Sequence, residues 1–315
     1  DMVSNTNYSL VDINGDGFPD LVDAQDNSSS AVWLNGNTPY WKVYLGNGSS
    51  FSLTAQNWTI PAMQTSAYDL DMVNNTYYNL VDMNGDGKPD LVDPQDNNSG
   101  AVWLNGNSPY WKVYLNNGTS FNLTAQNWSI PILENSASAL IRISNGNYSL
   151  MDINGDKIPD LVDAQDNNSG AVWLNGNSPY WKVYLNSGTA FNMTAQNWSI
   201  PIVENSAQNL DMVGNGYFSL LDINGDGTPD MVDAQDNNSG AVWLMNGNTP
   251  YWKVYVNNGQ GFSTTAQNVT VPAVQSSAQD LDMVNNTNYT VVDMNGDGKP
   301  DMVDPQDNSS NAVWL

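Results

Sequence analysis

One acidic loop recurs five times along this 315-residue chain at almost constant spacing. The first copy reads Asp12-Ile-Asn-Gly-Asp-Gly-Phe-Pro-Asp20, and the later copies begin at Asp82, Asp152, Asp222 and Asp293. The steps between copies are therefore 70, 70, 70 and 71 residues. Self-similarity at a fixed period predicts a tandem array of one supersecondary unit, not one irregular domain.

The array divides into four full repeats, numbered 1 to 4, at residues 1–70, 71–140, 141–210 and 211–281, and a partial repeat 5 at 282–315. Repeat 4 carries one extra residue, Met245, at a place where a turn would absorb an insertion most easily. The chain starts and stops in mid-pattern without an apolar leader or a terminal cap. We therefore expect a segment of a longer, processed protein.

The acidic loops have the ligand pattern of a calcium site. Each carries oxygen side chains at positions 1, 3, 5 and 9, and four of the five have glycine at position 6. Ca²⁺ prefers hard oxygen ligands around such a sharp turn, and a bare turn would not need aspartate at three positions in every copy. With the position-7 carbonyl included, the predicted ligands are Asp12, Asn14, Asp16, Phe18 and Asp20; Asp82, Asn84, Asp86, Lys88 and Asp90; Asp152, Asn154, Asp156, Ile158 and Asp160; Asp222, Asn224, Asp226, Thr228 and Asp230; and Asp293, Asn295, Asp297, Lys299 and Asp301.

The third loop departs from this pattern because Lys157 stands where the others have glycine. The lysine costs the turn conformational freedom and adds a positive charge, so this site should bind Ca²⁺ most weakly. A second acidic pair, Asp23 and Asp26 with their equivalents, follows every loop. It either adds metal ligands or solvates the turn, and the sequence leaves the two readings equal.

Composition limits the possible partners. Acidic residues outnumber basic ones by 33 to 8, for a net charge of −25, so phosphate backbones would be repelled and nucleic acid is an unlikely partner. Without metal, the clustered carboxylates would repel one another, so we expect Ca²⁺ to be part of the fold. The chain has no cysteine for disulfides and no histidine for transition metals or base catalysis. It also has no apolar run approaching the roughly 18 residues of a membrane span.

Apolar alternation predicts β structure throughout. In repeat 1, segments 8–13 and 19–23 flank the acidic loop, followed by 31–34, 40–45, 51–55 and 57–60, with a turn at 46–48. No segment shows a sustained helical apolar stripe, so helix should be scarce. The predicted class is all-β, with tandem antiparallel repeats of about 70 residues.

The loop, the Pro-Asp-Leu-Val after it, and the Trp-Lys-Val-Tyr-Leu-Asn-x-Gly-x-x-Phe segment resemble the FG-GAP/VCBS repeat family, which includes integrin-type β-propeller blades. The resemblance covers each repeat nearly end to end. It implies four-stranded blades with Ca²⁺ held between two strands. Repeats of this kind can close into a propeller or stack openly into a fibre, and both alternatives stay open.

Recurring tryptophans and sequons complete the pattern. Trp33, Trp41 and Trp58 and their equivalents could stack on sugars, but we expect core filling for Trp41. Val269 replaces the third tryptophan in repeat 4, so that column is less certain. Two columns of Asn-x-Ser/Thr predict N-glycosylation if the protein is secreted. The sites are Asn27, Asn97, Asn167, Asn237 and Asn308 in the first column, and Asn57, Asn127, Asn197 and Asn268 in the second.

Catalysis is not indicated, because an active site is usually a unique constellation and every acidic group here recurs. We therefore expect a non-enzymatic, secreted structural protein of the cell surface or an extracellular filament, built with further copies of itself. The alternative is a calcium-dependent propeller lectin or adhesin that binds carbohydrate or a cell-surface partner.

Overall fold

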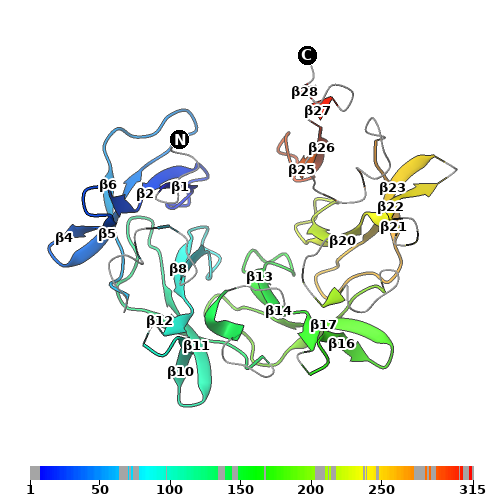
Figure 1. The fold of residues 1–315 in the computed structure, drawn as a ribbon, viewed down its shortest axis with the longest axis horizontal. Coiled ribbons are helices and arrows are strands. Elements are labelled where there is room, and N and C mark those ends of the chain that lie inside the picture. The colour runs from blue at the N-terminus through cyan, green and yellow to red at the C-terminus, as the bar shows by residue number, and fades with distance from the viewer. Residues whose placement is uncertain are drawn as a thin grey trace. The chain divides into compact units, whose positions relative to one another are not determined.

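The computed structural model describes residues 8–63, 70, 72–73, 78–96, 98–133, 139–143, 148–166, 168–202, 210–211, 213, 218–236, 238, 240–245, 248–272, 281, 284, 289–304, 306–307 and 312–313. The chain forms two compact units (Figure 1). The first comprises residues 1–145 and 186–194, and the second comprises 146–185 and 195–315. No helix in the described ranges is long and apolar enough to cross a membrane.

Repeat 1 forms one antiparallel sheet of six strands in the order β1-β2-β5-β4-β3, with β6 on the other side of β5. The strands are β1 (Tyr8–Val11), β2 (Asp20–Asp23), β3 (Gln25–Asp26), β4 (Ala31–Asn35), β5 (Thr38–Tyr44) and β6 (Gln56–Thr59). The long strand β5 is central, because β4 pairs with its first half, β2 with its second half and β6 with its opposite edge.

Repeats 2 to 4 repeat this topology. Repeat 2 has β7 (Asn79–Val81), β8 (Asp90–Asp93), β9 (Gln95–Asp96), β10 (Ala101–Asn105), β11 (Ser108–Tyr114) and β12 (Gln126–Ser129), then the 3₁₀ helix η1 (Ala139–Ile141). Repeat 3 has β13 (Tyr148–Met151), β14 (Asp160–Asp163), β15 (Gln165–Asp166), β16 (Ala171–Asn175), β17 (Ser178–Tyr184) and β18 (Gln196–Ser199). Repeat 4 has β19 (Ser219–Leu221), β20 (Asp230–Asp233), β21 (Gln235–Asp236), β22 (Ala241–Met245), β23 (Thr249–Tyr255) and β24 (Gln267–Thr270).

Repeat 5 contributes two small two-stranded sheets. These are β25 (Thr290–Val292) with β26 (Asp301–Val303), and β27 (Gln306–Asp307) with β28 (Ala312–Val313). The predicted fold class is confirmed: the protein is all-β, built of tandem antiparallel blade-like sheets.

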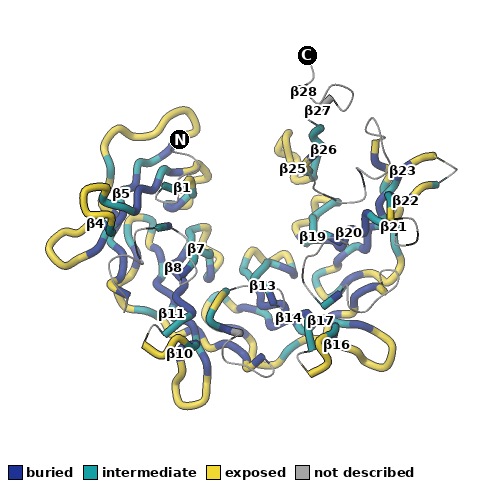
Figure 2. Tube along the Cα trace, viewed as in Figure 1, coloured by how far each residue is buried: buried dark blue, intermediate teal, exposed yellow. Residues whose placement is uncertain are grey.

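The central strand shows why the sequence adopts this form. Along β5, burial alternates so that Pro39, Trp41 and Val43 face the core, while Tyr40 and Lys42 are half-buried. This period of two is the signature of a strand covered more fully on one face. In repeat 2, β8 is instead buried at all four residues, as expected for an inner strand covered on both faces. Figure 2 shows buried strands and exposed hairpin tips, as at β4 and β10.

Two details differ from the sequence prediction. Segment 51–55 forms no strand and makes only one isolated bridge, between Gly46 and Phe51. The extra strand β3 lies in the polar turn after the acidic loop, where we predicted no strand. The equivalent segments of later repeats place a phenylalanine against a neighbouring repeat: Phe121 contacts Trp41, and Phe262 contacts Trp181.

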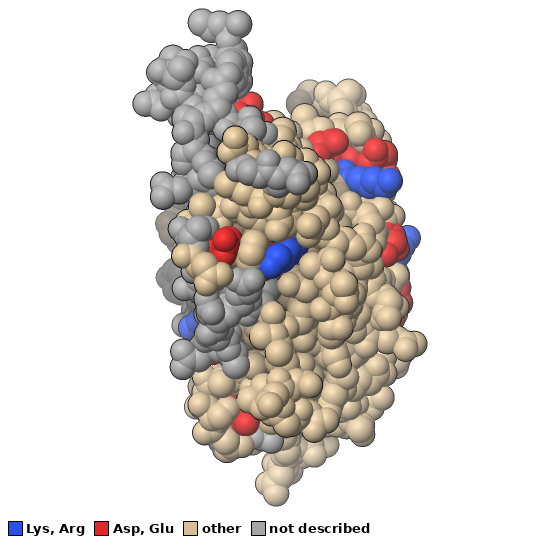
Figure 3. Space-filling view, turned by 90° about the vertical axis from the view of Figure 1, so that its right-hand side faces the viewer, with Lys and Arg blue, Asp and Glu red and all other residues tan. Residues whose placement is uncertain are grey.

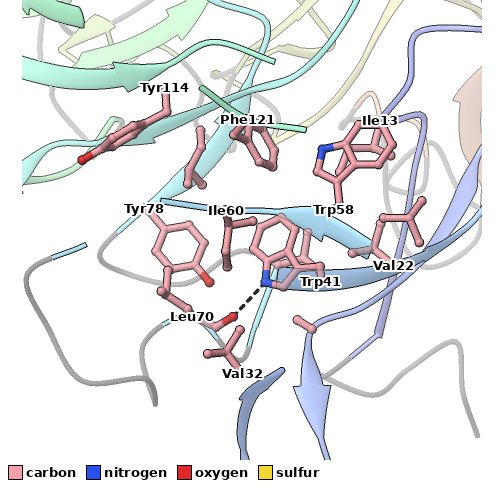
Figure 4. Packing of buried hydrophobic residues seen from close by; sticks show 14 of the residues in the cluster. Ile13, Val22, Val32, Trp41, Trp58, Ile60, Leu70, Tyr78, Tyr114 and Phe121 are labelled. Carbon is pink, nitrogen blue, oxygen red and sulfur yellow. Dashed lines mark hydrogen bonds between the residues drawn. The ribbon is translucent and has the colours of Figure 1, made fainter. Parts of the chain in front are cut away.

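Tryptophan fills the core between repeats, as predicted for Trp41. The Trp41 side chain is fully buried, and its indole N–H donates to the Leu70 carbonyl at 2.8 Å. In Figure 4, Trp41 lies among Ile60, Tyr78 and Phe121. Trp111, Trp181 and Trp252 donate in the same way to Leu140, Leu210 and Leu281. Trp58 and its counterparts Trp128 and Trp198 are buried too, which settles that column as core.

Neighbouring repeats within a unit share one interface. In the first unit, the Phe121 ring meets Trp41 edge-on at a centroid distance of 5.8 Å, and the Phe121 N–H donates to the Thr59 carbonyl at 3.1 Å. In the second unit, Phe262 makes the same two contacts with Trp181 and Ser199, at 5.7 Å and 3.2 Å. The interface is therefore repeated, with a buried aromatic pair at its centre.

Candidate metal centre in the acidic loops

The acidic loop of repeat 1 joins strands β1 and β2 and is closed by its own aspartate. The Asp12 carboxylate accepts the backbone N–H groups of Gly15, Asp16 and Gly17 at 2.8, 3.1 and 2.7 Å. Gly15 and Gly17 both have positive φ angles, 77° and 89°, which glycine adopts without strain. The turn thus wraps its backbone donors around the position-1 carboxylate.

Positions 3 and 5 are linked to each other. Asn14 Oδ1 accepts the Asp16 N–H at 2.8 Å, and Asn14 Nδ2 donates to Asp16 Oδ2 at 2.9 Å. Asp16 Oδ1 also accepts the Phe18 N–H at 2.9 Å. The structure therefore brings Asp12, Asn14 and Asp16 together on one solvent-facing turn, with each carboxylate already stabilised by backbone donors.

Position 9 has a different environment. Asp20 is fully buried, and its two carboxylate oxygens accept the N–H groups of Ile13 and Gly46 at 3.1 and 2.8 Å. Asp90 and Asp230 repeat this arrangement with Met83 and Asn116, and with Ile223 and Asn257. The position-9 carboxylate thus joins the loop to the turn after the long strand. Its predicted role as a metal ligand stays a prediction.

The electrostatics show that the loop carboxylates act on one another. Burial is the main cause that raises the pKa of Asp90 to about 7, and the charges of Asp82 and Asp86 raise it further, against the opposing N–H groups of Asn116 and Met83. Burial likewise raises the pKa of Asp230 to about 6. At position 1 the direction reverses, since the Gly298 N–H is the main cause of a lowered pKa for Asp293.

All five loops share this geometry. The position-1 carboxylates of Asp82, Asp152, Asp222 and Asp293 accept the same three N–H groups at 2.7–3.2 Å. In the third loop, Lys157 adopts a φ of 70° and its N–H still reaches Asp152, at 2.7 Å. The lysine therefore takes up a glycine-like conformation, as its place in the motif predicted.

Position 7 differs between loops and connects neighbouring ones. The Phe18 ring lies beside Gly48, the Lys88 stem lies against Gly15 of the preceding loop, and Thr228 lies against Gly155. The Lys88 ammonium is 3.5 Å from Asp86. Within a unit, the acidic loops of consecutive repeats therefore adjoin. On the face drawn in Figure 3, acidic and basic side chains occupy scattered spots in a mostly uncharged surface.

The donor chemistry fits a hard cation only in part. Asp12, Asn14 and Asp16 offer carboxylate and amide oxygens, which are Ca²⁺ ligands. Across the described residues, however, no three carboxylates converge closely enough to hold a metal ion together. The Asp20 carboxylate points to backbone donors instead. A metal in this loop would be held from positions 1, 3, 5 and 7, and Asp20 at position 9 would have to ligate it while also accepting the N–H groups of Ile13 and Gly46.

The second acidic pair is placed differently from the loops. Asp93 is buried, and it lies directly across the sheet from Lys112. The Lys112 ammonium lies 3.2 Å from the centre of the Trp103 ring. Burial is the main cause that raises the pKa of Asp93 to about 7. Asp26, in contrast, is half-buried and accepts the N–H and hydroxyl of Ser28. Asp93 and Asp26 therefore lie in different environments.

The two predicted glycosylation columns are described unequally. In the first column, Asn27 is exposed and its side chain lies 3.4 Å from the Tyr8 hydroxyl. Asn97, Asn167, Asn237 and Asn308 fall outside the described residues. In the second column all four asparagines, Asn57, Asn127, Asn197 and Asn268, are exposed on the last strand of their sheet.

Sequence reasoning missed one set of residues that tie the loops together. The buried Asn116 amide donates to the carbonyl of Ile13 at 2.7 Å, inside the loop of the preceding repeat. In the same way, the Asn186 amide donates to the Met83 carbonyl at 3.0 Å, and the Asn257 amide donates to the Ile153 carbonyl at 2.7 Å. The sequence pattern that could have indicated these residues is an asparagine after the long strand in repeats 2 to 4, at the position where repeat 1 has Gly46.

Comparisons with known proteins do not assign a family. No protein-family profile matches the chain, and no curated protein matches it. An Agrocybe aegerita lectin structure concerned with recognition of non-reducing terminal N-acetylglucosamine aligns over 95% of this chain and 60% of its own, with 18% identity and a TM-score of 0.48. The Photorhabdus luminescens Tc holotoxin pore aligns over 96% of this chain and 13% of its own, with 16% identity and a TM-score of 0.38.

A complex of TcdB2-TccC3 with Cdc42 aligns over 94% of this chain and 13% of its own, with 16% identity and a TM-score of 0.34. The chain thus spans 60% of the lectin chain and a much smaller share of the toxin chains. At these identities and TM-scores, the alignments give no function to this protein.

Proposed function

We propose that this chain is a non-enzymatic structural repeat protein of the FG-GAP/VCBS type, part of an extracellular filament or cell-surface layer. The observation that carries the proposal is the equivalent interface between neighbouring repeats, with the same phenylalanine, tryptophan and asparagine at its centre. Stacking like units through one interface is how repeat proteins build extended structures.

The outer face of repeat 1 supports assembly with further copies. Phe51 is 42% exposed, whereas its counterpart Phe121 is 2% exposed because Trp41 covers it. Beside Phe51 lie two hollows of about 370 and 350 Å³, the second lined by Tyr8, Leu21, Asp23, Tyr44, Phe51, Ser52 and Leu53. A face that another repeat covers elsewhere is suited to receive a repeat of the same kind, and in a homopolymer a second copy supplies it.

Assembly is tested by light scattering and electron microscopy on the purified chain. We expect concentration-dependent association and filaments, and Phe51→Asp should abolish both by placing a charge in the face. Leu34→Asp is the matched control, because Leu34 on strand β4 is 51% exposed and does not line either hollow. A monomer at every concentration, or equal effects of the two substitutions, would contradict the homopolymer.

Calcium is part of this proposal. The loop residues at positions 1, 3, 5 and 7 would hold Ca²⁺, whose charge would offset the mutual repulsion of the loop carboxylates. Binding to the folded state alone would raise its stability. Isothermal titration should show uptake, and a chelator should lower the melting temperature. If neither a calorimetric signal nor a melting shift appears, calcium has no structural role here.

An extracellular setting is supported by the exposed sequon column on the last strand of each sheet, at Asn57, Asn127, Asn197 and Asn268. Glycopeptide mass spectrometry on material from the native source tests this, with glycans expected there and at Asn27. Unmodified peptides at all these positions would remove the glycosylation proposal.

The second candidate is carbohydrate binding, and the hollow beside Phe51 favours it. Aromatic rings from Tyr8, Tyr44 and Phe51 line it together with the Asp23 carboxylate, a combination that suits a sugar ring with its hydroxyls. Glycan-array binding that Phe51→Ala abolishes, on a chain that stays monomeric, would favour a lectin over a filament.

A further inference from the structure

Asparagine followed by glycine occurs at three places in a typical repeat. In repeat 1 these are the acidic loop (Asn14-Gly15), the hairpin tip between β4 and β5 (Asn35-Gly36) and the turn after β5 (Asn47-Gly48). This dipeptide has its own chemistry, because glycine has no side chain to shield its backbone nitrogen. That nitrogen can attack the asparagine Cγ, which forms a succinimide ring and releases ammonia. Water then opens the ring to aspartate or isoaspartate.

The acidic loops hold both reacting groups. The attacking nitrogen of Gly15 donates its hydrogen to Asp12 at 2.8 Å. The Asn14 amide is fixed on both sides, since Oδ1 accepts from Asp16 N and Nδ2 donates to Asp16 Oδ2. The other four loops carry the same three hydrogen bonds around Asn84, Asn154, Asn224 and Asn295. Reaction there requires the loop to open first.

In repeats 2 and 4, the turn after the long strand is held as well. Asn117 Oδ1 accepts the N–H groups of Thr119 and Ser120 at 2.9 and 3.0 Å. The attacking nitrogen of Gly118 donates to the buried Asn116 side chain at 2.9 Å. The corresponding nitrogen of Gly259 in repeat 4 donates to Asn257, also at 2.9 Å.

The hairpin tips lack such restraint. Asn35, Asn105 and Asn175 are exposed, as are the glycines that follow them, and Figure 2 shows these tips as exposed loops. Each tip asparagine is the last residue of its strand, at the Asn35↔Thr38 pair and its equivalents. No side-chain hydrogen bond involves these three asparagines in the part of the chain that the structure describes. The equivalent Asn246 lies outside it.

We propose that the hairpin tips at Asn35, Asn105 and Asn175 are sites of spontaneous deamidation, while the hydrogen-bonded acidic loops protect their Asn-Gly pairs from it. In each event the Gly N–Cγ bond forms and the Cγ–Nδ2 bond breaks with loss of ammonia. Water then cleaves one of the two C–N bonds of the ring: cleavage at Cγ leaves aspartate, and cleavage at the backbone carbonyl carbon leaves isoaspartate. The product carries one more negative charge, and in the isoaspartate form it carries one more backbone carbon. The changes fall at exposed tips, away from the buried aromatic interfaces.

The test follows deamidation of the intact chain by peptide mapping at mildly alkaline pH. A chelator is present, so that bound metal cannot protect the loops and any protection comes from the hydrogen bonds of the protein itself. A sample unfolded in urea gives the intrinsic rate of each Asn-Gly pair. Relative to that reference, the tips should react at least about tenfold faster than the loops, because hydrogen bonds must break before a loop can react.

Two variants locate the cause within one molecule. Gly36→Ala should slow the reaction at Asn35 alone, while Asn105 and Asn175 continue as internal references. Asp12→Ala removes the acceptor that holds Gly15, so Asn14 should accelerate while Asn84 and Asn154 stay protected. Loops that react as fast as tips in the folded chain would overturn the proposal. So would tips that stay intact over a period in which the urea sample is fully converted.

Discussion

Replacing Asn116 with alanine tests how repeats 1 and 2 are joined. The asparagine side chain is 3% exposed and satisfies three partners: its Nδ2 donates to the carbonyls of Ile13 and Pro89 at 2.7 and 3.0 Å, and its Oδ1 accepts the Gly118 N–H at 2.9 Å. Alanine keeps the backbone bond from residue 116 to Asp90 but removes all three side-chain bonds.

The expected cost follows from those bonds. A typical intramolecular hydrogen bond contributes about 0.5–1.5 kcal/mol, and a buried group left without a partner costs about 1–3 kcal/mol. We therefore expect Asn116→Ala to lower the free energy of unfolding by about 2–4 kcal/mol.

The measurement must resolve the two units, because a two-unit chain need not unfold in one step. Hydrogen exchange followed by mass spectrometry, combined with urea unfolding, reports on each unit separately. Asn116→Ala should reduce protection in residues 8–133. The counterpart Asn257→Ala, which loses bonds to Ile153 and Pro229, should instead reduce protection in the second unit, in residues 148–185 and 195–272.

Asn117→Ala is the matched control, because this neighbouring asparagine is exposed and, among the described residues, its side chain bonds only within its own turn. It should cost at most about 1 kcal/mol. If the two neighbouring substitutions have equal effects, or if Asn116→Ala leaves protection around Ile13 unchanged, the bond between repeats does not contribute as argued.

Three further predictions concern single side chains. Phe121→Ala should lower the free energy of unfolding in urea by about 3–5 kcal/mol, because it empties the site beside Trp41. Phe51→Ala should lower it by under about 1 kcal/mol, because that ring is 42% exposed. Similar losses for the two variants would refute the role of the neighbouring repeat. Lys157→Gly should stabilise by about 0.5–1 kcal/mol, because it relieves a side chain held at a φ of 70°, and a lowered melting temperature would refute this. Burial raises the pKa of Asp93 to about 7 from 3.8, so the folded state binds more protons than the unfolded state between these values and stability falls as the pH rises through them. Asp93→Asn should therefore gain stability relative to the parent over that range, by at most about 4 kcal/mol, and parallel pH profiles of the two proteins would contradict the assignment.

Much of the local structure could be predicted from the sequence. The period fixed the number of repeats, and the alternation of segments such as 40–45 gave the strands. The glycine positions of the acidic loop indicated where positive φ angles are needed, and Lys157 adopts one at the place where the motif requires it. These features depend on neighbouring residues along the chain, so one sequence is enough to recognise them.

Other features depend on contacts between distant residues. Segment 51–55 has strand-like alternation, yet the Phe121 ring of the equivalent segment serves the preceding repeat. Asp20 has the spacing of a metal ligand, but burial beside Ile13 and Gly46 gives its carboxylate backbone donors. Asn116 follows a strand as many turn asparagines do, but its amide donates to a carbonyl 103 residues earlier in the chain.

The sequence by itself determined an all-β array with one acidic loop per repeat, because local turn chemistry and a period of two depend only on short-range sterics and hydrogen bonding. Only the tertiary structure decided which polar groups are buried between repeats, and hence that Asp20 and Asn116 join segments of the fold while Asp12, Asn14 and Asp16 face solvent. A side chain is buried only where a second segment of the chain packs over it. Side chains of the same type therefore have different roles, depending on whether another segment covers them.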